Sequence, residues 1–117
     1  MIEVGIDIVD TNRFTEYLDK SDTRLSKCFT VDELDYCFRR NSPSDSLAGK
    51  FAAKEAIIKI LTNQGINISH LREIEVLNDD NGKPFVKSSP LERINDQIRI
   101  SISHDGGFAI ALIALLE

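Results

Sequence analysis

Residues 46–61 constrain the fold more than any other segment of the chain. Their apolar side chains recur around most of the circumference of a helix, which is typical of a helix that other elements surround. The charged side chains form two rows: Lys50 and Lys54 share one face four residues apart, and Glu55 and Lys59 share another. We therefore expect a central helix with few polar positions.

Alternating apolar residues predict strands on both sides of this helix in the sequence. The apolar residues at even positions 2–8 alternate with Glu3, Gly5 and Asp7, which predicts a strand over residues 1–9 with one buried face and with Asp7 pointing away from the isoleucine row. Residues 108–116 are almost uniformly apolar, which predicts a strand buried on both faces.

Shorter strands are expected between them. Ile74 and Val76 alternate with glutamates, and the turn of residues 78–82 joins this strand to a second one at residues 83–86. Residues 98–103 alternate again and lead into a Gly-rich turn. These neighbours in sequence predict antiparallel pairing.

Helix signals are present at three further places. Asp10 or Thr11 is a suitable cap for a helix through about residue 20, and Thr30 with Glu33 is a capping-box signal for a helix through about residue 39. The loop of residues 41–45, with Pro43, is expected to end that helix. A short helix is expected at residues 90–97.

Size and composition fit one small globular domain. The chain has 117 residues, of which 42% are hydrophobic and 28% charged, so residues 1–117 are expected to form a single domain of the α+β class. Its small, mainly antiparallel sheet is expected to pack on the long central helix. No apolar run approaches the roughly 20 residues of a membrane span, and two cysteines without metal-ligand spacing indicate reduced thiols in the cytoplasm.

The charge distribution excludes one class of partner and admits another. A net charge of −5 argues against nucleic acid as the main partner, because phosphate contacts need a basic face. Residues 10–60 nevertheless hold nine Lys and Arg against nine Asp and Glu. We expect the first half of the chain to face an anionic partner.

Asp7 and Glu55 are the candidates for a metal site, and each has a simpler interpretation. Asp7 is either a solvent-facing strand residue or a ligand with space beside it at Gly5. Glu55 lies on a helix with little polar surface, so it either pairs with Lys59 four residues on or binds a cation. Two carboxylates on separate elements suit Mg²⁺, which completes its coordination with water and substrate phosphate oxygens.

Cationic residues near this pair indicate phosphoryl-type chemistry. Lys50, Lys54 and Lys59 on the central helix and Lys83 in the turn are suited to neutralising phosphates. His104 at the end of its strand is either a half-buried structural residue or, because a Gly-Gly turn follows, part of a site at the strand end.

Four motifs in this order resemble the short 4′-phosphopantetheinyl transferases, and the resemblance covers nearly the whole chain. The motifs are Gly5-Ile6-Asp7-Ile8-Val9 with Arg13, the segment from Leu47 to Ala56 with Lys59, Asn81-Gly82-Lys83-Pro84, and the strand from Ser101 to His104. The resemblance implies the fold of that family and the transfer of 4′-phosphopantetheine from coenzyme A to a serine of an apo acyl carrier protein.

The resemblance also implies roles for single residues. Asp7 and Glu55 would hold Mg²⁺ at the coenzyme A pyrophosphate, with Lys59 beside the phosphates. Glu55 is the first choice for the base that accepts the serine proton, and His104 is the second. The residues at positions that contact coenzyme A in the family are Lys50, Lys59, Gly82, Lys83, Pro84 and His104.

A docking surface and an assembly follow from the same resemblance. The carrier protein is expected to dock on a helix that presents Arg13, Tyr17, Lys20 and Arg24, and the chain is expected to form a homotrimer with active sites between subunits. A non-catalytic module that binds coenzyme A or a carrier protein is the main alternative. A small structural oligomer, in which Glu55 and Lys59 form only a surface ion pair, is the other.

Overall fold

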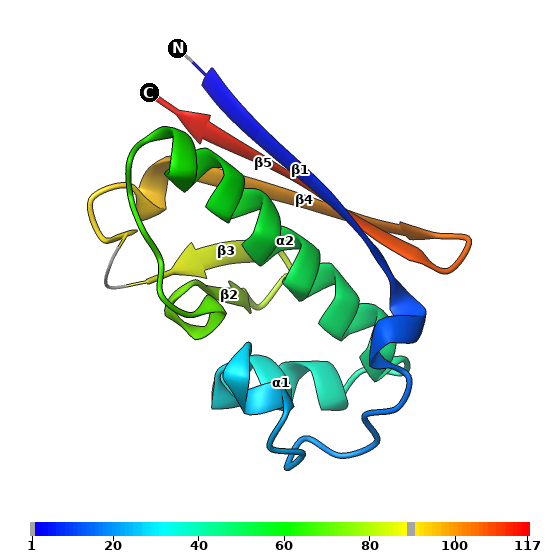
Figure 1. Cartoon of the computed structure of the whole chain (residues 1–117). Helices are drawn as coiled ribbons and strands as arrows, with labels where there is room; N and C mark the ends of the chain where they lie inside the picture. Colours follow the sequence, from blue (N-terminus) through cyan, green and yellow to red (C-terminus); the bar gives the residue numbers. More distant parts are fainter. Residues whose placement is uncertain (1, 89–90) are drawn as a thin grey trace.

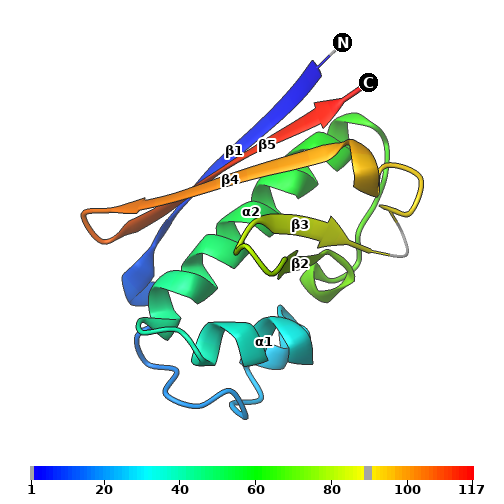
Figure 2. The same ribbon diagram turned by 180° about the vertical axis from the view of Figure 1, so that it is seen from behind.

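A long helix lies between a three-stranded sheet and a small hairpin (Figures 1 and 2). The structure, a computed structural model, describes residues 2–88 and 91–117. Its main elements are β1 (Ile2–Asp10), α1 (Val31–Phe38), α2 (Pro43–Asn63), β2 (Glu75–Asn78), β3 (Pro84–Lys87), β4 (Ile98–Asp105) and β5 (Phe108–Leu116). The large sheet has the order β1-β5-β4, the hairpin pairs β2 with β3, and both are antiparallel. The predicted α+β fold is confirmed.

Helix α2 is buried around most of its circumference, as its sequence predicts. Gly49, Ala52 and Ala56 are fully or nearly fully buried, and these small residues allow the helix to approach the sheet closely. The loop predicted at residues 41–45 is shorter than expected, because α2 already begins at Pro43. Proline is tolerated in the first helical turn, where its missing N–H would have no intrahelical partner.

The buried face of β1 is the opposite of the predicted one. Gly5 and Val9 are buried and Asp7 is partly buried, whereas the four apolar residues at even positions are 58–65% exposed. The reason is the fit to α2: a Cβ on Gly5 would lie 2.3 Å from the Ala56 carbonyl oxygen. The space beside Gly5 is therefore filled by the helix backbone and not available to a ligand.

Strand β5 is also buried on one face only, contrary to the prediction. Ala109, Ala111, Ile113 and Leu115 face α2 and are buried, while the alternate residues are exposed except for Ala114, which is partly buried. The exposed residues of β1 and β5 form an apolar surface that we call the outer face, which consists of Ile2, Val4, Ile6, Ile8, Phe108, Ile110, Leu112 and Leu116.

The helix predicted through residue 20 is reduced to one 3-10 turn, Thr11–Phe14. Asp10 caps it, but Asp19 and Asp22 accept hydrogen bonds from the amides of Ser21 and Arg24, and such local bonds compete with helix formation. The capping box at Thr30 is confirmed at the start of α1.

The predicted helix at residues 90–97 is likewise short. Pro90 lies outside the described residues, and the described part of the segment contains the 3-10 turn Asn95–Gln97. Within residues 2–88 and 91–117, no helix has the length and apolar content to cross a membrane.

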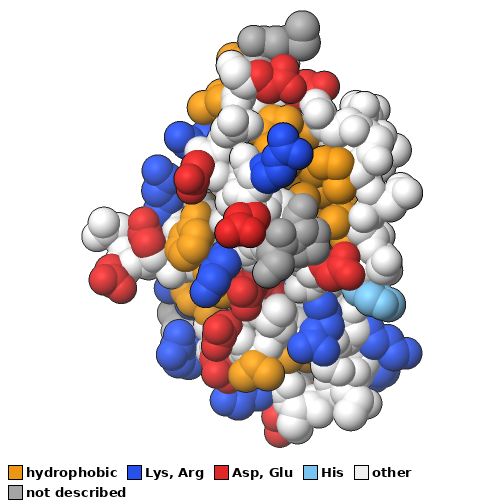
Figure 3. Space-filling model, turned by 90° about the vertical axis from the view of Figure 1, so that its left-hand side faces the viewer, with side chains coloured by type: hydrophobic (Ala, Val, Ile, Leu, Met, Phe, Trp, Pro, Cys, Tyr) orange, Lys and Arg blue, Asp and Glu red, His pale blue; other side chains and the backbone are white. Residues whose placement is uncertain are grey.

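Charges of both signs are mixed on the face that Figure 3 shows, where Lys and Arg side chains lie among Asp and Glu. Cys28 and Cys37 are both free thiols, partly buried and buried respectively. Burial raises the pKa of Cys37 to about 12.

Candidate active site

Asp7 and Lys59 meet where β1 packs on α2. The Lys59 ammonium donates to the Ile6 carbonyl oxygen at 2.6 Å and lies 3.3 Å from Asp7 Oδ1. The Asp7 side chain is 20% exposed and that of Lys59 56% exposed, so the pair can be reached from solvent. Asp7 and Lys59 are therefore in direct contact at an accessible place on the surface.

Glu55 lies on the same side of α2 as Lys59, one turn away, and is partly buried. In the part of the chain that the structure describes, no hydrogen bond or ion pair involves Glu55, because the ammonium of Lys59 turns to β1 instead. The ion pair between Glu55 and Lys59, one of the two alternatives for Glu55, is not formed, and Lys59 pairs with Asp7 instead. Glu55 keeps a carboxylate without a cationic partner among these residues.

The donor set at this place fits a hard divalent cation. Asp7 on β1 and Glu55 on α2 would supply the oxygen ligands that Mg²⁺ prefers, and the partly exposed Asp7 would leave room for water and phosphate. Residues 2–88 and 91–117 contain no group of three or more His, Cys, Asp or Glu side chains arranged for a metal. A site with two protein ligands that relies on substrate oxygens does not require one.

A cleft of about 420 Å³ opens on the other side of α2, between α1, the β2–β3 hairpin and β4. It is lined by Tyr36, Arg40, Ser46, Gly49, Lys50, Asn78, Gly82, Pro84, Ile100, Ser101, Ile102 and His104. Four of the residues expected to contact coenzyme A line this one cleft: Lys50, Gly82, Pro84 and His104. Lys83 is exposed beside it in the hairpin turn, where its amide donates to Asp79 Oδ1.

Lys50 forms part of the cleft wall. Its ammonium donates to the Val76 carbonyl oxygen and to Asn78 Oδ1, both at 2.6 Å, and lies 4.6 Å from the ring centre of Tyr36. Burial lowers the pKa of Lys50. Lys54, also expected near the phosphates, is fully buried in an ion pair with Glu33.

His104 connects β4 to the start of α2. Its Nε2 lies 2.7 Å from the carbonyl oxygen of Asp45, so this nitrogen carries the proton and donates it. A second cleft of about 420 Å³ adjoins His104 and is lined by Arg39, Arg40, Asn41, Ser42, Asp45 and Ser46. The two arginines make this end of the combined cleft suitable for phosphate groups.

The two parts of the site lie on opposite sides of α2. Lys50 and Glu55 are five residues apart, so their side chains point about 140° apart around an α-helix. Lys50 and Lys59 point about 180° apart. Asp7 belongs to the outer strand β1 and His104 to the outer strand β4, with β5 between them. One chain therefore does not place its carboxylate pair in its own nucleotide-sized cleft.

The residues expected to dock a carrier protein do not share one helix: Arg13 lies in the 3-10 turn Thr11–Phe14, and Tyr17, Lys20 and Arg24 lie in the segment that follows it. The Arg13 guanidinium stacks on Phe51 at 4.7 Å from the ring centre. Lys20 pairs with Asp35, and Arg24 pairs with Asp22 and Glu16 and stacks on Tyr17 at 4.7 Å. Arg13, Tyr17 and Arg24 border a small cavity of about 160 Å³.

Several cleft residues were not identified from the sequence. Tyr36, Asn78 and the Arg39-Arg40 pair line the clefts, but their segments have the patterns of an ordinary helix end and an ordinary hairpin turn. The adjacent arginines, which only Asn41 separates from the Ser-Pro start of α2, were the one available signal, since a helix N-terminus favours anions.

Comparison with known proteins defines the class to which this fold and site belong. Residues 3–113 match the 4′-phosphopantetheinyl transferase superfamily, and the chain is a member of that family. The resemblance seen in the sequence motifs is thereby confirmed.

Within the superfamily, the chain is similar to holo-[acyl-carrier-protein] synthases. That of Halothermothrix orenii is 38% identical, with 94% of this chain and 93% of the relative covered, and that of Protochlamydia amoebophila is 42% identical, with 92% of each covered. The solved ACPS–CoA complex of Chronobacterium ammoniagenes aligns with a TM-score of 0.80 at 30% identity, over 99% of this chain and 97% of that one. The Helicobacter pylori synthase in complex with coenzyme A gives 0.76 at 30% identity, over 95% and 97%.

Proposed function

We propose that this protein transfers 4′-phosphopantetheine from coenzyme A to a serine of apo acyl carrier protein, releasing adenosine 3′,5′-bisphosphate. The observation that carries the proposal is the pairing of a solvent-accessible carboxylate and lysine site with a separate cleft suited to a nucleotide, in a chain of this family. Full-length similarity to holo-[acyl-carrier-protein] synthases, including structures with coenzyme A, supports the same reaction.

In this reaction the serine oxygen forms a bond to the β-phosphorus of coenzyme A while the bond from that phosphorus to the bridging oxygen breaks. The leaving group is the bisphosphate, and the serine proton passes to a base. Asp7 and Glu55 would hold Mg²⁺, which when bound supplies positive charge to the pyrophosphate. Lys59 would exchange its contact with Asp7 for the phosphate oxygens and stabilise the charge that develops on them.

Glu55 is the preferred base. Its carboxylate has no hydrogen bond among the described residues, while Nε2 of His104 already donates to the Asp45 carbonyl oxygen. His104 also lies at the nucleotide cleft and not beside Asp7. We assign His104, with Lys50, Gly82, Lys83 and Pro84, to binding of the nucleotide part of coenzyme A.

We propose a homotrimer in which each active site combines two subunits. The carboxylate pair and the cleft lie on opposite sides of α2, so a neighbouring chain is needed to bring them together. The outer face supports assembly, because its residues on β1 are 58–65% exposed and those on β5 36–46% exposed. Contiguous apolar surface of this kind marks an interface on a small protein.

The carrier protein is proposed to dock on the segment that carries Arg13, Tyr17, Lys20 and Arg24. An acidic segment of the carrier would meet the Arg13 guanidinium directly and would compete with Asp35 and Asp22 for Lys20 and Arg24. The free thiols Cys28 and Cys37 support a cytoplasmic location for the reaction.

The test is a mass measurement on apo acyl carrier protein after incubation with coenzyme A and Mg²⁺. We expect the mass of one phosphopantetheine to be added by the wild type, and at least a hundredfold slower addition by Asp7→Ala and Glu55→Ala. Full activity of either variant would contradict the metal assignment. Coenzyme A binding without any mass gain would instead support a non-catalytic module.

A further inference from the structure

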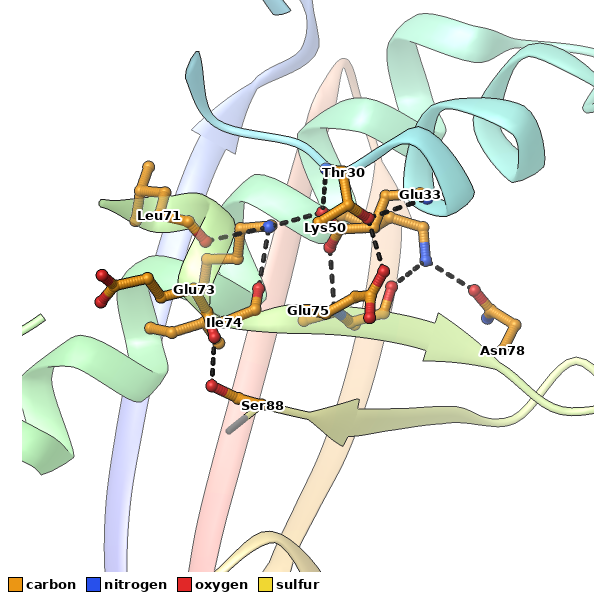
Figure 4. Close-up of polar contacts among 11 residues, drawn as sticks. Thr30, Glu33, Lys50, Leu71, Glu73, Ile74, Glu75, Asn78 and Ser88 are labelled. Atoms are coloured by element: carbon orange, nitrogen blue, oxygen red, sulfur yellow. Dashed lines mark hydrogen bonds and ion pairs between the residues drawn. The ribbon is translucent and has the colours of Figure 1, made fainter. Parts of the chain in front are cut away.

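The edge of β2 that does not pair with β3 is hydrogen-bonded by side chains (Figure 4). Lys54 Nζ donates to the carbonyl oxygen of Ile74, the residue immediately before β2, at 2.8 Å, and Lys50 Nζ donates to the carbonyl oxygen of Val76 at 2.6 Å. The Val76 amide donates to Glu33 Oε2 at 2.8 Å. Two helices thus provide the donors and the acceptor that a further strand would otherwise supply.

All the hydrogen-bond donors of the Lys54 ammonium are used in this arrangement. The ammonium donates to Glu33 Oε1 at 2.7 Å, to the Leu71 carbonyl oxygen at 3.1 Å and to the Ile74 carbonyl oxygen, which uses all three protons. The side chains of Lys54 and Glu33 are both 0% exposed. Lys54 consequently has no donor left for a substrate phosphate.

Hydrogen bonds continue from this edge to the cleft. Lys50, one turn before Lys54, donates to Asn78 Oδ1, and Asn78 Nδ2 donates to the Gly82 carbonyl oxygen at 3.1 Å. Lys50, Asn78 and Gly82 all line the cleft assigned to the nucleotide. These polar contacts, from buried Lys50 to partly exposed Asn78, add to the apolar packing of Val76 and Val86 in holding the hairpin β2–β3 against α2.

We propose that Lys54 and Glu33 are positioning residues for coenzyme A: by bonding the free edge of β2 they fix Asn78 and Gly82 at the cleft wall and set the affinity for the nucleotide. This role rests on the proposed function and deepens it. It also separates two lysines of one helix, since Lys59 acts at the phosphates and Lys54 acts through β2.

The geometry makes the cleft sensitive to this contact. A carbonyl or amide of β2 that loses its buried partner must find another or shift toward water, because an unpaired buried polar group costs about 1–3 kcal/mol. Because β2 has only four residues, a shift at Val76 is transmitted to Asn78 two residues on. The carboxylate pair at Asp7 and Glu55, on the opposite side of α2, should be unaffected.

The test is a double variant, Lys54→Met/Glu33→Leu, which removes both charges and leaves neither buried charge unpaired. We expect the Kd and the KM for coenzyme A to rise at least tenfold, with kcat and the KM for carrier protein within about threefold of the wild type. Hydrogen exchange of the Val76 amide should become faster. Leu115→Ala in β5 is the matched control, since it empties core volume outside the hairpin, and it should lower Tm without changing the Kd.

Other outcomes would overturn the proposal. A lower Tm with an unchanged Kd would show a purely structural role, and a hundredfold loss of kcat with an unchanged Kd would place Lys54 at the chemistry. Should the double variant not fold, Glu33→Gln is the second variant: it sets an amide against Val76 or Lys54 and should raise the Kd at least threefold. If the wild type binds coenzyme A but does not transfer phosphopantetheine, the proposed function is contradicted, and the comparison of Kd values still decides the role of Lys54 and Glu33. If the wild type does not bind coenzyme A, both the proposed function and this inference are overturned.

Discussion

Gly5 determines how closely β1 and α2 approach at the carboxylate pair. Its missing Cβ leaves space for the Ala56 carbonyl, one residue from Glu55, and Asp7 is the next residue on the same face of the strand. A larger residue would push the strand away from the helix and separate Asp7 from Lys59. The glycine that the sequence suggested as a ligand space is a packing requirement of the site.

Gly5→Ala should lower the free energy of unfolding by about 3 kcal/mol or more, because a Cβ 2.3 Å from a backbone oxygen cannot be accommodated by side-chain rotation. Gly49→Ala is the control: its Cβ would meet side-chain atoms of His104 and Ile102 at 3.1 Å, so a smaller loss is expected. Urea unfolding measures both. Equal losses would show that the backbone contact is not the cause.

Cys37 gives the protein a pH dependence in the alkaline range. Because burial raises its pKa to about 12, the thiol stays protonated in the folded chain while it ionises near its usual pKa of 9.0 in the unfolded chain. The unfolded state thus binds fewer protons between pH 9 and 12. The contribution of Cys37 to stability is complete below about pH 9 and is lost as the pH rises toward 12.

We expect the stability of the wild type relative to Cys37→Ala to fall by about 1.4 kcal/mol between pH 8 and pH 10. Urea unfolding of both proteins under reducing conditions measures this difference. The subtraction is needed because burial lowers the pKa of Lys50 and Lys54, which acts in the opposite direction. Parallel stability curves for the two proteins would contradict the prediction.

At the scale of elements, α1 depends on a cap shared with β2. Thr30 Oγ1 accepts a hydrogen bond from the Glu33 amide and donates one to Glu75 Oε2 at 2.6 Å. One hydroxyl therefore caps α1 and also bonds a side chain of β2. Thr30→Ala should cost about 1–2 kcal/mol of unfolding free energy. Thermal unfolding monitored by circular dichroism measures the loss.

Thr15→Ala is the matched control for that prediction. Its hydroxyl donates to the Asn12 carbonyl oxygen on an exposed turn, so we expect a change within about 0.5 kcal/mol. Thr30→Ser, which keeps the hydroxyl, should recover most of the stability. If Thr30→Ala and Thr15→Ala were equally mild, the shared cap would not contribute to the fold.

Elements with a single strong local signal were predictable from the sequence. The apolar run of α2, the capping box of α1 and the alternation of β4 each depend on neighbouring residues. The prediction of a helix after Asp10 was wrong. Aspartate side chains in this segment accept hydrogen bonds from nearby backbone amides, which competes with helix formation, and the spacing of apolar residues does not reveal that competition.

The candidate site was predictable only in part. Asp7, Glu55, Lys59 and His104 were named from residue types and motifs, but their distribution over two sides of α2 depends on strand order, which the local pattern does not contain. Which face of β1 is buried depends on the element that packs against it. The row of Ile2, Val4, Ile6 and Ile8 predicts a buried face, but these residues are exposed in the single chain.

At the scale of the whole molecule, the outer face should control both assembly and activity. Leu112→Glu places a charge at its centre, opposite Ile6, and should convert the proposed trimer to monomers with at least a hundredfold lower transfer rate. Val31→Glu is the control, because Val31 is 67% exposed outside the sheet and should leave the assembly unchanged. Light scattering after size-exclusion chromatography measures the mass, and a fully active Leu112→Glu monomer would refute inter-subunit sites.

Mixing two inactive variants tests the shared site directly. Asp7→Ala disables the carboxylate pair, and Arg40→Glu reverses a charge at the cleft. If the proposed inter-subunit sites form, mixed assemblies should recover part of the activity, since some sites would combine an intact pair with an intact cleft from the neighbour. Recovery should require subunit exchange, so cross-linking each variant before mixing should abolish it.

The pairing of β1 with β5 has a consequence for synthesis of the chain. Ile2 pairs with Leu116, so β1 can join its sheet only after β5 has left the ribosome. Until then β1 carries exposed apolar side chains and two unpaired edges, which is a condition that favours association with other nascent chains. The newly made polypeptide should therefore depend on chaperones more than its small size would suggest.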